Sequence, residues 1–317
     1  MKIESFYSDY FLKFNVISTD SRKVVKDSIF ISLSGENFNG NRFASSALEN
    51  GAALAVVDDA DFFVDNGKYV LVDDSLTFLQ KLANYHRTHF NCPVLAITGT
   101  NGKTTTKELV AGALLLKFKT YYTQGNLNNQ IGVPLTLLSV NPNDAQFVVV
   151  EMGANHLTDI QELCDIAQPD YALVTSVGKA HLEGFGSIDA VVKTKTDLYR
   201  FVEKNHGICF VNADSELLMN NKPNSNFILY GTNRNDVYLT CWGMPDSNKV
   251  NVSFKWRYGT EAICNVSSSL YGQYNYLNML AAACVACFFG VDCFDVNDFL
   301  SKFNTNNNRS QIIEKEN

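Results

Sequence analysis

Continuous apolar runs alternate with amphipathic stretches over residues 93–204. The apolar runs are PVLAIT (93–98), FVVVEMG (147–153) and YALVTSVG (171–178), and helical patterns occupy about 104–118, 158–167 and 188–204. Runs of this length without polar alternation are typical of strands buried on both faces. Their alternation with helices predicts a doubly wound, mainly parallel sheet, in which ligands bind beyond the carboxyl ends of the strands.

A smaller α/β unit is predicted before this sheet. Strand patterns occupy 28–33, 53–58 and 69–74, and helical patterns occupy 42–52 and 75–90, the latter with Ser75 as its N-cap. We therefore expect a small N-terminal domain over 1–90, a central domain over 91–303 and a linker over 304–317. The predicted fold class is α/β.

The pattern changes from about residue 207. Two further core strands are followed by segments that alternate polar and apolar residues up to Gly272, as antiparallel strands do at one edge of a sheet. An apolar helix follows from about residue 274. The longest uncharged stretch, 270–291, contains Gln273 and two asparagines, so it predicts a buried helix and no membrane insertion.

Composition narrows the classes of function. The 317 residues suit two or three domains, and 46% apolar with 19% charged residues is typical of a globular protein. A formal net charge of −7 makes nucleic acid an unexpected partner, so any phosphate site must be local. The start, MKIESFYSDY, lacks the apolar core of a secretory signal, and a cytoplasmic location is expected.

The segment ITGTNGKTTTKEL (97–109) resembles a phosphate-binding loop but departs from the usual G-x-x-x-x-G-K-[ST], because Ile97 stands where the first glycine belongs. Gly99 and Gly102 still lie between a strand and a helix, where backbone N–H groups can face phosphate. Lys103 suits the terminal phosphates and the Thr104 hydroxyl suits Mg²⁺. A plain glycine-rich turn is the alternative.

Two further side chains follow predicted strands at the same edge. Glu151 ends FVVVE, and His181 comes shortly after YALVTSVG. A carboxylate there suits a magnesium nucleotide site. A single acid at a strand end is more often solvated, and a single histidine after a strand is more often structural than a ligand. Their placement beside the loop makes both candidate metal ligands.

A series of segments resembles the Mur ligase family over almost the whole chain. In order they are ITGTNGKTTTKEL (97–109), GNLNNQIGVPLTLL (125–138), VVEMGAN (149–155), VGKAHLEGFGS (177–187) and YGQYNYLNMLAAA (271–283), preceded by TDSR (19–22) and GENFNGNRFASSALENGA (35–52). The family loop is G-T-N-G-K-T-T, so the missing glycine is the family's own variant. The resemblance identifies a nucleotide site with a tighter loop, in a P-loop ATPase domain.

The resemblance implies an ATP- and Mg²⁺-dependent amide ligase of peptidoglycan precursor synthesis, acting through an acyl phosphate. Within the family, the chain is most similar to members that add D-alanyl-D-alanine to a UDP-N-acetylmuramoyl-tripeptide. These two molecules are the expected substrates, and a monomer is expected. Another Mur ligase, a folylpolyglutamate-synthase-like ligase and a non-catalytic nucleotide-binding module remain as alternatives.

The resemblance also implies roles for particular residues. The residues expected to bind nucleotide are Gly99, Thr100, Asn101, Gly102, Lys103, Thr104, Thr105, Asn129 (with Asn128 as the competing alignment), Asn275, Asn278 and Arg309. The residues expected to bind metal are Thr104, Glu151, His181 and Lys195, and those expected to act in catalysis are Lys103, Lys195 and His181. The residues expected to bind substrate are Asp20, Ser21 and Arg22. Tyr274 replaces the histidine of the family's adenine-side motif.

One lysine of VVKTKTDLY becomes a carbamate in related ligases, and its new anion binds Mg²⁺. Lys193 and Lys195 are two residues apart and cannot share a helix face. The family pattern aligns with Lys195, and an unmodified lysine on a solvated face is the alternative. In the family a third domain follows the segment around Arg309. We therefore expect these 317 residues to be an inactive portion of a longer enzyme.

Overall fold

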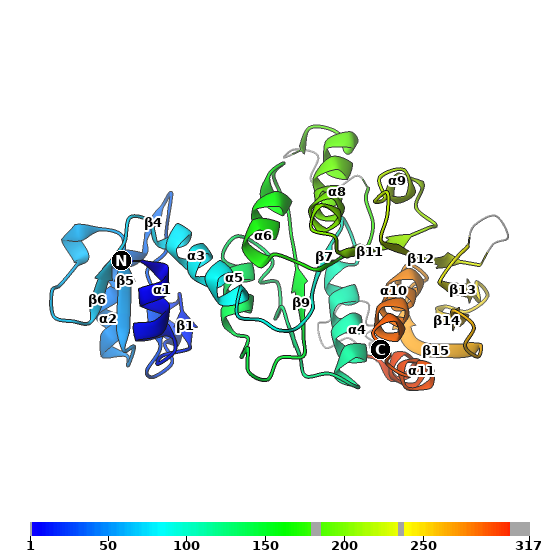
Figure 1. Cartoon of the computed structure of the whole chain (residues 1–317), viewed down its shortest axis with the longest axis horizontal. Coiled ribbons are helices and arrows are strands. Elements are labelled where there is room, and N and C mark those ends of the chain that lie inside the picture. The colour runs from blue at the N-terminus through cyan, green and yellow to red at the C-terminus, as the bar shows by residue number, and fades with distance from the viewer. Residues whose placement is uncertain (1, 179–184, 234–237, 305–317) are drawn as a thin grey trace, which may run out of the picture. The chain divides into compact units, whose positions relative to one another are not determined.

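The computed structural model describes residues 2–178, 185–233 and 238–304, and these residues form two compact units. Within the described ranges, the first unit comprises the chain up to Asn91 together with Leu127–Asp144 and Asp165–Gln168, and the second comprises the rest. The fold class predicted from the sequence is confirmed, because a small parallel sheet and a larger, mainly parallel sheet are both present (Figure 1).

The first unit is built on a four-stranded parallel sheet in the order β1-β2-β5-β6. Its strands are β1 (Ile17–Ser18), β2 (Ile29–Ile31), β5 (Leu54–Val57) and β6 (Tyr69–Leu71), with the short hairpin β3 (Ser34–Gly35) and β4 (Phe38–Asn39) beside them. Its helices are α1 (Ile3–Phe6), α2 (Ala44–Glu49), α3 (Ser75–Arg87) and α5 (Gly132–Leu138), with short helical turns η1 (Tyr7–Phe11), η2 (Ser21–Lys23), η3 (Gly40–Phe43) and η4 (Ala60–Phe62). Every residue of β2 and β5 is buried.

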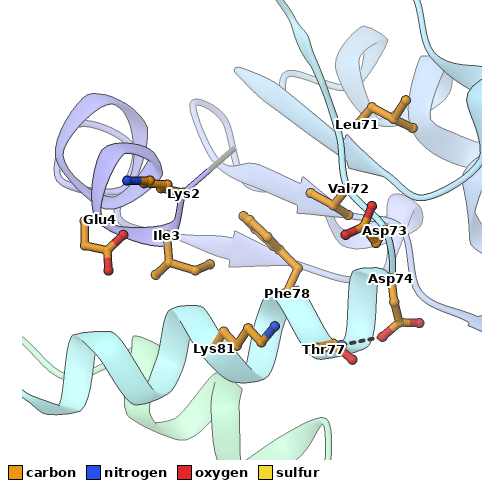
Figure 2. A pocket seen from close by; sticks show the side chains of 10 residues that line it. All are labelled: Lys2, Ile3, Glu4, Leu71, Val72, Asp73, Asp74, Thr77, Phe78 and Lys81. Atoms are coloured by element: carbon orange, nitrogen blue, oxygen red, sulfur yellow. Dashed lines mark hydrogen bonds between the residues drawn. The ribbon is translucent and has the colours of Figure 1, made fainter.

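The start of α3 corrects one prediction. Asp74, and not Ser75, caps the helix, because its carboxylate accepts a hydrogen bond from the Thr77 N–H over 2.7 Å. A carboxylate satisfies a first-turn N–H and also favours the positive end of the helix dipole. Figure 2 shows this bond at the edge of a cavity of about 720 Å³, where Lys2 and Lys81 lie near the apolar side chain of Phe78.

The second unit is built on a nine-stranded sheet in the order β15-β14-β13-β12-β11-β10-β7-β9-β8. Its strands are β7 (Val94–Thr98), β8 (Thr120–Tyr122), β9 (Phe147–Glu151), β10 (Tyr171–Val174), β11 (Ile208–Asn212), β12 (Phe227–Thr232), β13 (Cys241–Pro245), β14 (Asn251–Tyr258) and β15 (Cys264–Tyr271). Pairing is parallel from β8 through to β13, and β14 and β15 are antiparallel. The predicted antiparallel edge is therefore present.

Helices cover this larger sheet and position its functional edge. They are α4 (Lys103–Leu115), α6 (Asp159–Ala167), α8 (Ile188–Lys204), α9 (Glu216–Met219), α10 (Asn275–Phe288) and α11 (Cys293–Lys302). The helices α4 and α10 lie side by side and share a hydrophobic core with Leu95 and Ile97 of β7 (Figure 1). None of the helices in the described ranges is both long and apolar enough to cross a membrane.

Candidate active site

The loop between β7 and α4 is shaped by two glycines. Gly99 and Gly102 have φ angles of +149° and +81°, which L side chains rarely adopt. Space is also restricted, because a Cβ on Gly99 would collide with the Thr175 hydroxyl and one on Gly102 would lie 2.6 Å from Oδ1 of Asn278. The loop is therefore specified by backbone conformation and by close packing.

The end of β10 fixes the loop from the other side. The Thr100 N–H donates to the Ser176 carbonyl over 2.7 Å, and the Asn101 N–H donates to Oγ of Ser176 over 3.0 Å. The Thr175 hydroxyl donates to the Asn101 carbonyl over 2.6 Å. The sequence analysis did not predict these contacts of Thr175 and Ser176 with the loop. Their only signal in the sequence was a Thr-Ser pair at the end of an apolar segment.

Lys103 begins α4 and lies across the loop. Its Nζ donates to the carbonyl oxygens of Gly99 (2.8 Å) and Thr100 (3.1 Å), so the ammonium is held above the loop. The first intrahelical bond of α4 runs from the Thr106 N–H to the Gly102 carbonyl. The N–H groups before it, including that of half-buried Thr105, lie at the positive end of the helix dipole, where anions are favoured.

Thr104 meets Glu151, which is buried at the end of β9. The Thr104 hydroxyl donates to Oε1 of Glu151 over 3.1 Å. Two neighbouring ligands of an octahedral Mg²⁺ with bonds of about 2.0–2.1 Å lie roughly 2.9 Å apart. The two oxygens therefore fit one Mg²⁺. No cluster of three or more His, Cys, Asp or Glu side chains suited to a metal occurs in the described part of the chain, but Mg²⁺ beside a nucleotide commonly takes only one or two protein ligands.

Lys195 is buried on α8, with 3% of its surface exposed, whereas Lys193 is exposed. The Nζ of Lys195 lies 3.5 Å from the carbonyl oxygen of Ala154. Burial and, to a smaller extent, the positive charge of Lys103 together lower the pKa of Lys195 to about 7, against the opposing effect of Asp159. The unprotonated, nucleophilic form of this amine is therefore accessible near neutral pH.

Asn275 and Asn278 link α10 to the loop helix. The Thr106 hydroxyl donates to Oδ1 of Asn278, the Asn278 amide donates to Oδ1 of Asn275, and the Asn275 amide donates to the Tyr271 carbonyl. Both asparagines are buried. In this structure Asn278 packs against Gly102 and bonds to the helix that follows the loop. Tyr274, in contrast, is 69% exposed.

For three other predicted nucleotide or metal residues, the structure does not test the assignment. Asn129 belongs to the first unit, where its Oδ1 accepts from the N–H groups of Ile131 (3.2 Å) and Gly132 (2.9 Å) before α5. His181 and Arg309 lie outside the described residues.

The predicted substrate residues line a cavity of about 520 Å³ in the first unit. Asp20 accepts a bidentate pair of hydrogen bonds from Arg22, at 2.9 Å each, and these bonds lower the pKa of Asp20 to about 2. The cavity is also lined by Ser21 and by two stacked, solvent-exposed rings, Phe38 and Phe43, whose centroids are 5.5 Å apart. An ion pair beside exposed aromatic faces suits a ligand with a planar ring and a charged group.

Comparison with known families accounts for both units. Residues 97–286 match the Mur ligase middle domain, and residues 13–87 match the Mur ligase family catalytic domain. The chain belongs to the Mur ligase family. The loop between β7 and α4, Glu151 and Lys195 lie in the segment that matches the middle domain. The cavity beside Asp20 lies in the other matched segment.

Similar Mur ligases share most of this chain. The UDP-N-acetylmuramoyl-tripeptide–D-alanyl-D-alanine ligases of Bacillus subtilis and Haemophilus influenzae are 30% and 34% identical, over 94% and 93% of this chain. The solved MurF ligase of Thermotoga maritima in complex with ADP has a TM-score of 0.81 at 28% identity, covering 96% of this chain and 70% of that one. The chain spans 64% and 63% of the lengths of the Bacillus and Haemophilus relatives.

Proposed function

We propose that this chain supplies the precursor-binding and ATP-binding parts of a ligase that joins D-alanyl-D-alanine to a UDP-N-acetylmuramoyl-tripeptide. The observation that carries the proposal is the convergence of the Lys103 loop, the Thr104–Glu151 pair and buried Lys195 within one unit. The names of the relatives supply the substrate pair. We expect the protein to act as a monomer in the cytoplasm.

The proposed reaction has two steps. A carboxylate oxygen of the tripeptide bonds to the γ-phosphorus of ATP, and the bond to the bridging oxygen breaks to release ADP. The amine of D-alanyl-D-alanine then bonds to the acyl carbon, loses a proton and displaces phosphate. Lys103 exchanges its loop carbonyls for phosphate oxygens and neutralises charge during the first step.

Mg²⁺, held by Thr104 and Glu151, supplies further charge neutralisation to the phosphates when it is bound. The resemblance to the family adds His181 to this metal set. The N–H groups at the start of α4 would orient the nucleotide, because those of Thr100 and Asn101 already donate to Ser176.

Lys195 is proposed to become a carbamate. Its neutral amine bonds to the carbon of CO₂ and loses a proton, which converts the buried neutral amine into an anionic carbamate. The lowered pKa favours this step because the unprotonated amine is the nucleophile. Exposed Lys193 has no comparable burial, which supports Lys195 as the modified residue. The new anion beside Lys103 would add a ligand or partner for Mg²⁺.

The UDP group of the precursor is assigned to the cavity beside Asp20, Ser21 and Arg22. The uracil would stack on the exposed rings of Phe38 and Phe43, and the Arg22 guanidinium would meet a phosphate.

A calorimetric titration tests this proposal together with a phosphate-release assay. The 317-residue chain should bind UDP-N-acetylmuramoyl-tripeptide, yet release no phosphate when D-alanyl-D-alanine and Mg²⁺-ATP are added. Catalysis is expected to require the part of the relatives that extends beyond the matched 63–64% of their length. Absence of precursor binding contradicts the substrate assignment. Rapid turnover contradicts the requirement for the additional part.

A further inference from the structure

Lys107 is a fully buried lysine on α4, one helical turn after Lys103. Its Nζ lies 2.7 Å from the Thr123 carbonyl oxygen, 3.4 Å from the Gly125 carbonyl oxygen and 2.7 Å from the Glu108 carboxylate. An ammonium group has three N–H donors, and burying it without acceptors is costly. The three acceptors match these donors, so the side chain is a specific tie between α4 and the segment after β8.

Thr123 carries this tie to the neighbouring strand. It is fully buried just beyond β8, and its N–H donates to the Val149 carbonyl over 3.0 Å. Its Oγ1 accepts from the Glu151 N–H, also over 3.0 Å. The position of the Glu151 backbone is therefore set partly by Thr123, whose own carbonyl is held by Lys107.

The connections close into a ring. Glu151 accepts the hydroxyl bond from Thr104, and Thr104 lies on the same helix as Lys107. We propose that Lys107 is a positioning residue that holds Thr104 and Glu151 at the separation needed to bind one Mg²⁺, acting through Thr123. This inference rests on the proposed function, which assigns the metal to these two side chains.

Replacing Lys107 by methionine keeps an unbranched side chain but removes all three donors. The Thr123 and Gly125 carbonyls lose this buried donor, and the segment can shift to regain hydrogen bonds. A shift of Thr123 moves the acceptor of the Glu151 N–H and so disturbs the metal pair. The Lys103 loop and its clamp at Ser176 involve none of these bonds. The loss should therefore fall on the metal-dependent part of nucleotide binding.

The experiment is a calorimetric titration of the whole chain with ADP, once in excess Mg²⁺ and once in EDTA. We expect Mg²⁺ to tighten ADP binding to the unsubstituted chain. Lys107→Met should reduce affinity in Mg²⁺ about tenfold, while affinity in EDTA changes less than about twofold. Lys117→Met is the matched control, because it removes another lysine-to-carbonyl bond, to Gly290, beyond the end of α4.

Thr123→Val provides a second variant that keeps Lys107 and removes the acceptor of the Glu151 N–H. It should lower the Mg²⁺-dependent affinity in the same direction, and thermal unfolding of each variant checks that it is folded. If Lys107→Met is unfolded, the Thr123→Val result decides. The positioning role is overturned if Mg²⁺ still tightens ADP binding to the folded variants as it does for the unsubstituted chain. It is also overturned if the variants lose the same ADP affinity with and without Mg²⁺. Failure of the unsubstituted chain to bind ADP overturns the proposed function as well, so the two failures are distinguishable.

Discussion

The Thr104 hydroxyl donates a hydrogen bond to Oε1 of Glu151 over 3.1 Å, joining the first turn of α4 to the end of β9. Thr104→Val removes the oxygen and nearly conserves the volume. We expect affinity for Mg²⁺-ATP to fall about tenfold, equivalent to ~1.4 kcal/mol. Affinity for ATP in EDTA should be almost unchanged. Calorimetric titrations under the two conditions measure the difference, and equal losses would argue against a metal role for Thr104.

Carbamate formation at Lys195 should depend on pH. With a pKa of about 7, the amine becomes unprotonated as pH rises through 7, so the bound carbamate should increase from pH 6 to pH 8 at constant dissolved CO₂. Carbon-13 NMR with labelled CO₂ detects the carbamate carbon. Lys195→Ala should lack this signal and Lys193→Ala should retain it. The reverse pattern would assign the modification to Lys193.

Gly102→Ala should damage the loop by two effects. The φ angle of +81° costs an L-residue about 1–2 kcal/mol, and the new Cβ would press on Asn278 at 2.6 Å. Gly67→Ala is the matched control, because Gly67 has a φ of +76° with no atom within 4 Å of the added Cβ. Chemical denaturation should show a larger loss of stability for Gly102→Ala. Equal losses would mean that Asn278 yields without cost.

Phe38→Ala should weaken binding of the UDP precursor. Stacking of a base on an aromatic ring is worth about 1–3 kcal/mol by alanine substitution, so the dissociation constant should rise by roughly 5- to 150-fold. Phe294→Ala is the control, since Phe294 is 64% exposed on α11 of the other unit. Calorimetry compares the two. Unchanged affinity in Phe38→Ala would remove Phe38 from the uracil site.

The sequence predicted the elements whose signal is local. Continuous apolar runs identified β7, β9 and β10, and the glycine–lysine pattern identified the loop at the start of α4. Burial of Lys195 rather than Lys193 needed the structure, because both lie on one helix and only packing distinguishes their faces.

Contacts between segments far apart in the chain could not be predicted from the sequence. Ser176 lies 75 residues from Asn101 in the sequence, and neither residue type predicts that the two form a hydrogen bond. Lys107 would ordinarily be taken as a solvated helix residue, since lysine is almost never fully buried without partners. Asp and Ser are both favoured at helix N-caps, so the sequence did not decide between Asp74 and Ser75. In the structure the carboxylate of Asp74 caps α3.

The central claim is that Lys103 holds the phosphates of ATP in this loop. The most direct measurement is a calorimetric titration of the 317-residue chain with Mg²⁺-ATP, beside the same titration of Lys103→Ala. Because the lysine is the cation held over the loop carbonyls, its removal should weaken binding by about a hundredfold, or ~2.7 kcal/mol, while the variant keeps the unfolding temperature of the unsubstituted chain within a few degrees. Equal affinity of the two proteins for Mg²⁺-ATP would contradict the account.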